Sequence, residues 1–156
     1  MIIVKNGKII SSLPLPIAGI MSDQSGEWLK KNLTSERYEH SLGCADAAKG
    51  IAKIMGIDEN RAYLAGLIHD CAKCLPSYET QELLKKCDLV YGESENCKTH
   101  HAPAGACVAK EQFGIDDEEV LSAIRWHTLG KMNMTDFEKI IFLADKIEER
   151  TRPNEY

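Results

Sequence analysis

The sequence predicts an all-α fold, a helical bundle preceded by a short N-terminal β-hairpin. Two observations carry this prediction. From about residue 22 onward, apolar residues recur at the three- and four-residue spacing of amphipathic helices, and capping residues separate the segments. Before that point, the β-branched runs of residues 2–10 flank Asn6-Gly7, a strong signal for a two-residue hairpin turn.

The expected elements follow in order along the chain. Pro14 and Pro16 exclude a central strand or a helix interior between the hairpin and the first helix. Thr34 or Ser35 caps the second helix, Asp116 or Asp117 caps the sixth, and Thr135 and Glu138 form a capping box for the last. The expected helices are residues 22–33, 35–55, 58–70, 77–87, 102–113 and 117–127, and a last helix that begins after Thr135 and carries Asp145.

Composition excludes several classes of protein. The chain has 156 residues, 44% of them hydrophobic and 28% charged, which is enough for one domain with its own core. No apolar run approaches the roughly 20 residues that span a bilayer, so no membrane partner is expected. The net charge of −5 argues against a nucleic-acid polymer as partner, but not against nucleotides, because a bound metal can supply positive charge locally.

The beginning of the chain and its cysteines indicate a cytoplasmic protein. "MIIVKNGKII" lacks the unbroken apolar core of a signal peptide, so export is not expected. A domain of this size needs no disulfide staples. The six cysteines are therefore interpreted as free thiols, mostly small buried fillers.

His69 and Asp70 raise the main functional question, because they directly follow the apolar run of residues 63–68. Burial of an unpaired carboxylate or a charged imidazole is expensive. A metal ion would compensate both groups and would recruit further histidines and aspartates. Such residues stand near the apolar parts of other predicted helices: His40, His100, His101, His127 and Asp145.

The chemistry of this set suits a first-row divalent cation such as Fe, Mn, Co or Zn. A metal site with open positions acidifies bound water and polarises phosphoryl oxygens. Histidines that do not ligate the metal could bind phosphate or protonate a leaving group. Against this, a single histidine near a helix end is usually a satisfied cap, and Asp145 could simply pair with Lys146 or Arg150.

The order H…HD…D, formed by His40, His69-Asp70 and Asp145, resembles the HD superfamily of metal-dependent phosphohydrolases. The strings "RYEHSLG", "AGLIHDCAK", "HHAPAGA", "IRWHTLGKMNM" and "EKIIFLADKIE" narrow the resemblance to its YqeK-like members, over about residues 27–150. The resemblance implies an HD-domain helical bundle that holds a divalent metal, most often iron. It also implies symmetrical cleavage of dinucleoside tetraphosphates, such as diadenosine tetraphosphate, into two nucleoside diphosphates.

The resemblance also implies roles for individual residues. Metal ligands would be His40, His69, Asp70 and Asp145, and catalytic residues would be Asp70, His101 and His127. Substrate-binding residues would be Arg37, Gly43, Lys73, His101, His127, Arg150 and Arg152. The chain departs from the family where Thr151 stands at the position of a phosphate-binding arginine, and it stops at Tyr156, before the helices that close the family's nucleotide site.

Residues 6–23 resemble a different family. "NGKIISSLPLPIAGIMSD" is similar to a segment near the C-terminal end of adenine deaminases, and none of that family's catalytic metal ligands lie within it. No deaminase activity is therefore expected. The expected organisation is an extension, residues 1–26, followed by a C-terminally truncated HD domain, residues 27–156.

Three function classes remain open from the sequence. The first is the metal-dependent phosphohydrolase, on a dinucleoside tetraphosphate or another nucleotide. The second is a nucleotide-binding protein with little or no turnover. The third is a redox or structural zinc module built on the Cys71–Cys74 C-x-x-C motif, although that motif lacks the βαβ context of redox enzymes. A homodimer is also compatible with the resemblance.

Overall fold

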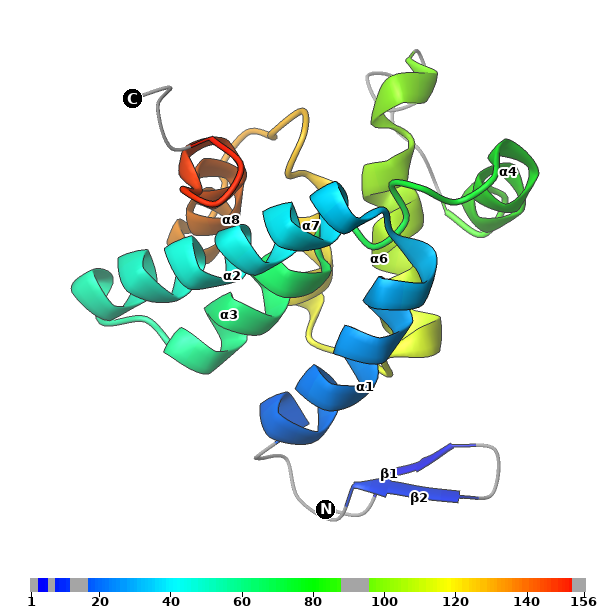
Figure 1. Cartoon of the computed structure of the whole chain (residues 1–156), viewed down its shortest axis with the longest axis horizontal. Helices are drawn as coiled ribbons and strands as arrows, with labels where there is room; N and C mark the ends of the chain where they lie inside the picture. The colour runs from blue at the N-terminus through cyan, green and yellow to red at the C-terminus, as the bar shows by residue number, and fades with distance from the viewer. Residues whose placement is uncertain (1–2, 6–7, 12–16, 88–95, 153–156) are drawn as a thin grey trace.

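The helical bundle expected from the sequence is present in the computed structural model, which describes residues 3–5, 8–11, 17–87 and 96–152 (Figure 1). The elements are β1 (Ile3–Lys5), β2 (Lys8–Ser11), α1 (Ile17–Asn32), α2 (Ser35–Met55), α3 (Glu59–Ile68), α4 (Ser77–Leu84), the 3₁₀ helix η1 (Cys97–Thr99), α6 (His101–Gln112), α7 (Glu118–Arg125) and α8 (Asp136–Ile147). Within the described ranges, no helix is long and apolar enough to cross a membrane.

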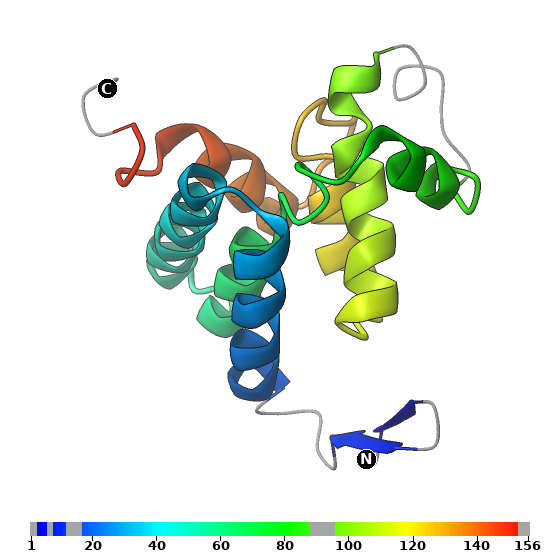
Figure 2. The same cartoon turned by 45° about the vertical axis from the view of Figure 1, so that its right-hand side comes forward.

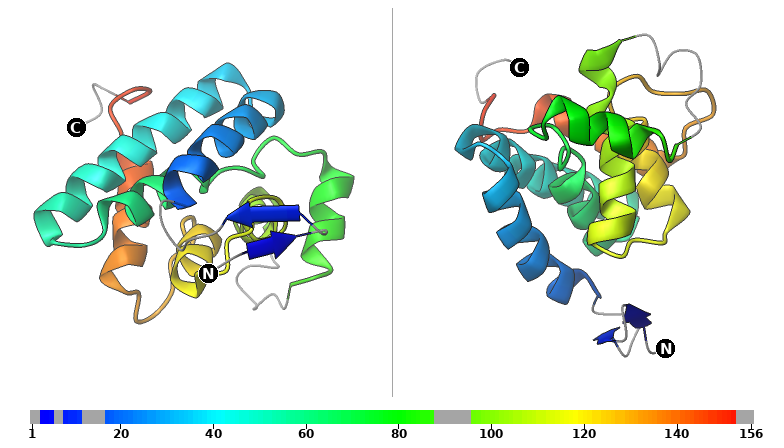
Figure 3. Two further views of the ribbon diagram at one scale, coloured as in Figure 1. Left: turned by 90° about the horizontal axis from the view of Figure 1, so that it is seen from below. Right: turned by 90° about the vertical axis from the view of Figure 1, so that its right-hand side faces the viewer.

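The two strands pair antiparallel, with Lys5 opposite Lys8 and Val4 opposite Ile9. The predicted hairpin turn at Asn6-Gly7 lies outside the described residues. Figures 1 and 3 show the strand pair beyond the N-terminal end of α1, on the far side of that helix from α2 and α8. Helix α1 begins at Ile17, earlier than the expected start at residue 22, because its helical turns extend back to the residue that follows Pro16.

The predicted helix ends are confirmed where capping residues define them. The Thr34 hydroxyl accepts a hydrogen bond from a backbone N–H in the first turn of α2, and Gly56 ends that helix with a φ of 70°. Helices α3 and α7 begin at aspartate caps. Thr135 and Glu138 form the capping box of α8. Local sequence signals therefore fix where α2, α3, α7 and α8 begin and where α2 ends.

Close helix contacts bring the site together. Helix α2 packs on α3 and α8, α7 packs on α6 and α8, and α1 packs on α3. Figure 2 shows α1, α2 and α3 on one side of the molecule and α4 and α6 on the other. A Cβ at Gly66 would lie 2.8 Å from the Cys44 carbonyl oxygen, so only glycine lets α3 lie this close to α2. At Gly105, a Cβ would lie 3.5 Å from the His69 carbonyl oxygen. The end of α3 and the turn after it are therefore packed closely between α2 and α6.

Candidate metal centre

Four histidines from four parts of the chain form one buried row of imidazole rings. The ring centroids are 5.3 Å apart for His40 and His69, 4.8 Å for His69 and His127, and 5.2 Å for His127 and His101. None of the four residues is more than 9% exposed. The structure therefore brings together the four histidines predicted as site residues, from α2, the turn after α3, the turn after α7 and the start of α6.

The fold places His40 and His69 by simple local rules. His40 is the first member of a buried stripe on α2 that continues, at four-residue spacing, through Cys44, Ala48 and Ala52. His69 ends α3 in a helical conformation, three residues after the glycine that contacts α2. The two imidazoles consequently face each other across the α2–α3 contact.

Each of the four rings is oriented by an acceptor at Nδ1. The Nδ1 atoms of His69, His127 and His101 donate to the backbone carbonyl three residues earlier, over 2.6, 2.7 and 3.0 Å. The Nδ1 of His40 lies 3.1 Å from a carboxylate oxygen of Glu148. Because these partners can only accept, the proton of each neutral ring resides on Nδ1. Nε2, with its lone pair, is turned toward the interior of the cluster.

The Nε2 atoms of His40 and His69 converge on Asp145. Its Oδ1 lies 2.9 Å from the Nε2 of His40 and 3.1 Å from the Nε2 of His69. A neutral imidazole nitrogen and a carboxylate oxygen are both acceptors, so this arrangement needs a positive charge between them, either protons on the rings or a metal ion. A cation shared by His40, His69 and Asp145 requires this pair of contacts.

Asp70 makes the corresponding contacts with the other two rings. Its Oδ1 lies 3.3 Å from the Nε2 of His101, 3.4 Å from that of His127 and 4.0 Å from that of His69. Its Oδ2 forms an ion pair with the Arg37 guanidinium. Asp70 is 1% exposed, so its charge is balanced entirely within the protein.

The pKa values of His40 and Asp70 show that the charges of the imidazoles and of the carboxylates stabilise one another. Burial opposes the charged ring of His40, but hydrogen bonds with Asp145 and Cys44 outweigh it and raise the pKa to about 9. Burial likewise opposes ionisation of Asp70, yet His69, His101 and His127 hold its pKa well below the usual range. The carboxylates are therefore charged at neutral pH, and without a metal the cluster holds protons in a metal's place.

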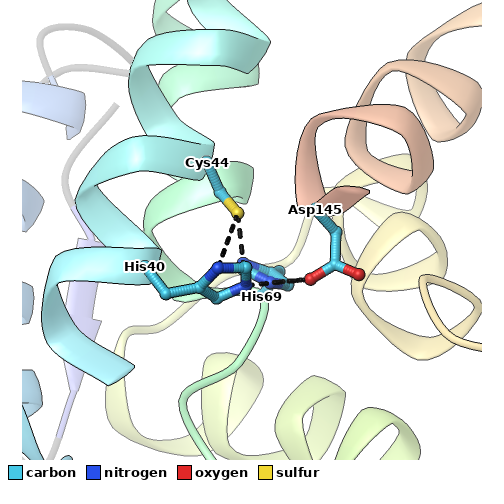
Figure 4. Close-up of side chains that lie close together, drawn as sticks. All are labelled: His40, Cys44, His69 and Asp145. Atoms are coloured by element: carbon cyan, nitrogen blue, oxygen red, sulfur yellow. Dashed lines mark hydrogen bonds and ion pairs between the residues drawn. The ribbon is translucent and has the colours of Figure 1, made fainter. Parts of the chain in front are cut away.

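The donor set fits a divalent metal ion. Ligand atoms of His40, Cys44, His69 and Asp145 all lie within 4.8 Å of one another (Figure 4). A second, overlapping group has ligand atoms of His69, Asp70 and His127 within the same limit. A metal-binding histidine in a protein typically binds the metal through one ring nitrogen and donates the N–H of the other to an acceptor, as the Nδ1 atoms of these rings do.

Glu148 is a member of this centre that the sequence analysis missed. Its carboxylate is fully buried and accepts from His40, from the backbone N–H groups of Arg150 and Thr151, and from the Thr151 hydroxyl. The signal was available, because residue 148 stands one helical turn beyond Asp145. Thr151, at the family's arginine position, thus holds the carboxylate that orients a candidate ligand.

Gly43 contributes to packing. A Cβ at this position would overlap the Glu148 carboxylate, so the glycine makes room for the buried acid. Cys44, the next residue, is 1% exposed, and its sulfur lies 3.4 Å from the Nε2 of His40. This cysteine is not among the site residues predicted from the sequence, although its position four residues after His40 places both on one helix face.

The predicted basic residues are distributed unevenly around the centre. Arg37 reaches it through Asp70. Arg150 instead pairs with two acidic residues on the exposed side of α2, Glu39 and Asp46, over 3.0 and 3.2 Å. Lys73 is exposed and Arg152 is half-buried. Lys146, considered from the sequence only as an ion-pair partner of Asp145, has its Nζ 3.7 Å from the Oδ2 of that residue.

The cysteines of the C-x-x-C motif differ from each other. Cys71 is buried and its thiol donates to the Gly105 carbonyl, as a small filler would, whereas Cys74 is exposed. The interpretation of the cysteines as mostly buried fillers holds for Cys71 and is wrong for Cys74, because the chain becomes exposed after Ala72. Among the described residues, the donor groups that could hold a metal include Cys44 but neither of these two.

Comparison with known proteins agrees with both resemblances seen in the sequence. The model of the HD domain family matches residues 37–150, and that of the adenine deaminase C-terminal domain matches residues 1–57. A solved structure described as a predicted HD superfamily hydrolase involved in NAD metabolism, from Clostridium acetobutylicum, superposes with a TM-score of 0.76. It is 44% identical and is matched over 81% of this chain and 68% of its own.

Two curated relatives carry the name symmetrical bis(5'-nucleosyl)-tetraphosphatase. The protein from Halalkalibacterium halodurans is 43% identical over 125 residues, and that from Bacillus subtilis is 36% identical over 121 residues. Each match covers 77% of this chain. The matched region spans 65% of the length of either relative.

Proposed function

The chain belongs to the HD domain family, and we propose that it is a metal-dependent phosphohydrolase that cleaves dinucleoside tetraphosphates symmetrically into two nucleoside diphosphates. One observation carries the proposal beyond family membership. Four buried imidazoles turn their Nε2 atoms toward two carboxylates, and this arrangement of acceptor atoms needs a cation. The rings of His101 and His127, which lie beside Asp70, can also carry protons. The names of the relatives from H. halodurans and B. subtilis supply the substrate class.

The metal would be held by His40, His69, Asp70 and Asp145, as the resemblance implies, with iron as the proposed ion. The contacts of Asp145 with His40 and His69 support three of these assignments directly. Asp70 lies at the junction between this group and the two remaining histidines. When bound, the metal would supply Lewis acidity that activates water and polarises phosphoryl oxygens.

His101 and His127 would face the phosphate chain. Their Nδ1 atoms are fixed by backbone carbonyls, so only Nε2 can exchange a proton with substrate. Hydrolysis breaks one P–O bond between the two central phosphates, and the departing phosphate oxygen must gain a proton or a balancing positive charge. We assign that role to one of these rings, with the other neutralising the developing charge. Asp70 holds both rings in position.

Basic residues would bind the outer phosphates. Arg37 is the best placed of them, because its guanidinium already contacts Asp70. Arg150 would have to leave Glu39 and Asp46 to reach a phosphate. Within the described residues, Lys73 and Arg152 form no ion pair that would have to be broken in this way. We further infer that the HD unit begins within α1, near residue 27. The homodimer expected from the resemblance stays a prediction, which sedimentation would test.

Product identification with diadenosine tetraphosphate tests the proposal. The metal-loaded protein should yield ADP as its only nucleotide product on chromatography. His101→Ala and His127→Ala should keep the metal and lose about 10²–10³ in rate, the usual cost of removing one donor at a developing charge. His40→Ala should lose both metal and turnover, because its ring contacts Asp145 directly.

His100→Ala is the matched control, because the ring nitrogens of His100 have no hydrogen-bond partner among the described residues. It should keep the rate within a few-fold. AMP plus ATP as products would reject symmetrical cleavage. Bound metal and bound ADP without any turnover would reject the enzyme in favour of a nucleotide-binding protein.

A further inference from the structure

Helix α4 is held to the rest of the bundle mainly through α6. Figures 1 and 2 show α4 at the edge of the molecule, away from α2 and α8. The element on which it packs most is α6. All residues of α4 are described, and only Leu84 among them is buried. A helix this short is marginal in isolation, so its position depends on the contact with α6.

Two cysteines lie at this contact, one from each side. Cys87 follows α4 and Cys107 belongs to α6, and each thiol donates to the same acceptor, the Leu83 carbonyl oxygen, over 3.7 Å. An ion pair of 2.8 Å between the Lys86 Nζ and the Glu111 Oε1 joins the same two segments. Lys86 is adjacent to one cysteine, and Glu111 stands one helical turn after the other. The two thiols therefore lie side by side across the α4–α6 contact.

The surroundings give the two thiols different reactivity. A hydrogen bond with Cys87, together with partial burial, raises the pKa of the Cys107 thiol, so Cys107 keeps its proton at neutral pH. The thiolate is the attacking form in thiol–disulfide exchange, so the first attack falls to Cys87. Cys87 and Cys107 are both half-buried, whereas Cys44 and Cys71 are buried. A small disulfide can therefore reach this pair from solvent.

We propose that Cys87 and Cys107 are a site of reversible modification, at which a disulfide forms and links α4 covalently to α6. The inference goes beyond the proposed function, because neither cysteine is among the donor groups of the metal centre. The oxidant is a low-molecular-weight disulfide of the glutathione type. In the reaction, two protein thiols are oxidised to one disulfide, and the small disulfide is reduced to two small thiols.

The reaction proceeds in two exchanges. The Cys87 thiolate attacks one sulfur of the small disulfide, and the other sulfur leaves with the electron pair of the broken S–S bond and takes up a proton. The Cys107 thiol then gives its proton to solvent, and its sulfur attacks the sulfur of Cys87. The second small thiolate leaves and is protonated in turn. An excess of small thiol reverses both exchanges.

The link would stabilise the part of the molecule that leads into the site. His101, the first residue of α6, stands between the two cysteines in the sequence. A disulfide that closes a loop of about 20 residues typically shifts an opening equilibrium by more than about tenfold. Openings that separate α4 from α6 should therefore become rarer in the oxidised protein.

Peptide mapping without reduction tests the pairing. The full chain is incubated with oxidised glutathione, the remaining thiols are alkylated, and the digest is analysed by mass spectrometry. The main cross-linked peptides should join Cys87 to Cys107, and reduced glutathione should separate them. Cys87→Ser and Cys107→Ser should each abolish this cross-link and leave the remaining cysteine as a mixed disulfide with glutathione or as a thiol.

The double variant Cys74→Ser/Cys97→Ser is the matched control, because Cys74 and Cys97 are exposed and are the most accessible alternative partners. It should form the same Cys87–Cys107 cross-link as the wild-type chain. Cross-links that run mainly to Cys74 or Cys97, or mixed disulfides alone in the wild-type chain, would overturn the proposed pairing.

Hydrogen exchange measures the effect of the link on α4. The amides of α4 should exchange at least about tenfold more slowly after oxidation of the wild-type chain, and at an unchanged rate in Cys107→Ser treated in the same way. A Cys87–Cys107 cross-link that leaves exchange in α4 unchanged would overturn the proposal that the disulfide holds α4 on α6.

Discussion

Replacement of Glu148 by glutamine should weaken metal binding without unfolding the protein. The Glu148 carboxylate accepts from the Nδ1 of His40 over 3.1 Å and thereby fixes the ring whose Nε2 faces Asp145. Glutamine keeps the size of the side chain, and so keeps the contact with Gly43, but it removes the negative charge. The imidazole loses a charged orienting acceptor and, with it, part of its basicity.

The expected size follows from the contacts. Outer-shell partners of metal-binding histidines are typically worth 10–100-fold in affinity, or about 1.4–2.7 kcal/mol. The stability of the metal-free protein should also fall, because the carboxylate is fully buried and accepts from two backbone N–H groups as well as from His40. A buried group left without a partner costs about 1–3 kcal/mol, and the amide oxygen of glutamine can replace only some of these bonds.

The assay is a chelator competition at fixed pH, accompanied by urea unfolding of the metal-free protein. Glu149→Gln makes the same chemical change one residue later, at an exposed position, and should leave both quantities unchanged. If folded Glu148→Gln binds the metal within twofold of wild type, the carboxylate does not orient a ligand. His40 would then have to be held by packing alone.

Two further predictions concern the metal-free protein and the α2–α3 contact. The pKa of His40 is raised to about 9 from an ordinary 6.5, so its contribution to folding is complete below pH 6.5 and is lost as the pH rises through 9. Urea unfolding of chelator-treated protein should therefore show a loss of at most about 3 kcal/mol across that window, and a stability that is flat or rising would contradict it. Gly66→Ala should destabilise by about 1–3 kcal/mol or more, because its Cβ would meet the backbone of α2 at 2.8 Å, whereas Gly50→Ala, with open space around it, should stabilise by about 0.5–1 kcal/mol. The same unfolding curves measure both, and equal effects would show that the α2–α3 contact tolerates a side chain.

Local signals in the sequence predicted the helices well, because the determinants of a helix end are themselves local. Thr34, Asp117 and the Thr135–Glu138 capping box each satisfy backbone groups within one turn. The start of α1 was placed too late, since its first turns carry no such signal and follow directly on Pro16. Where a helix begins after a proline depends on the elements that it packs against. Local sequence patterns carry no information about that packing.

The candidate site divides along the same line. His40, His69, His101, His127 and Asp145 could be selected because few residue types provide metal ligands and each stands beside an apolar helix face. Their convergence needed the resemblance or the structure, because it depends on contacts between helices that are far apart in the chain. Glu148 and Cys44 were missed for a related reason: an acid in "KIEER" resembles a solvated helix end, and a cysteine on a buried stripe resembles a filler. Only their distances to His40 distinguish them.

The basic side chains show why spacing alone is a weaker guide for substrate contacts than for ligands. Each histidine of the centre is fixed by the acceptor at its Nδ1, so the direction of its Nε2 is built into the fold, as the four Nδ1 contacts show. An arginine has a long stem and pairs with whichever carboxylate is nearest. Arg37 finds Asp70, inside the centre, whereas Arg150 finds Glu39 and Asp46 on the outside of α2. Asp70 is buried and Arg37 is half-buried, so their ion pair should be harder to break than the pairs of Arg150. Exposed Arg150 can exchange its surface partners for a phosphate at little cost, because exposed ion pairs contribute less than about 1 kcal/mol.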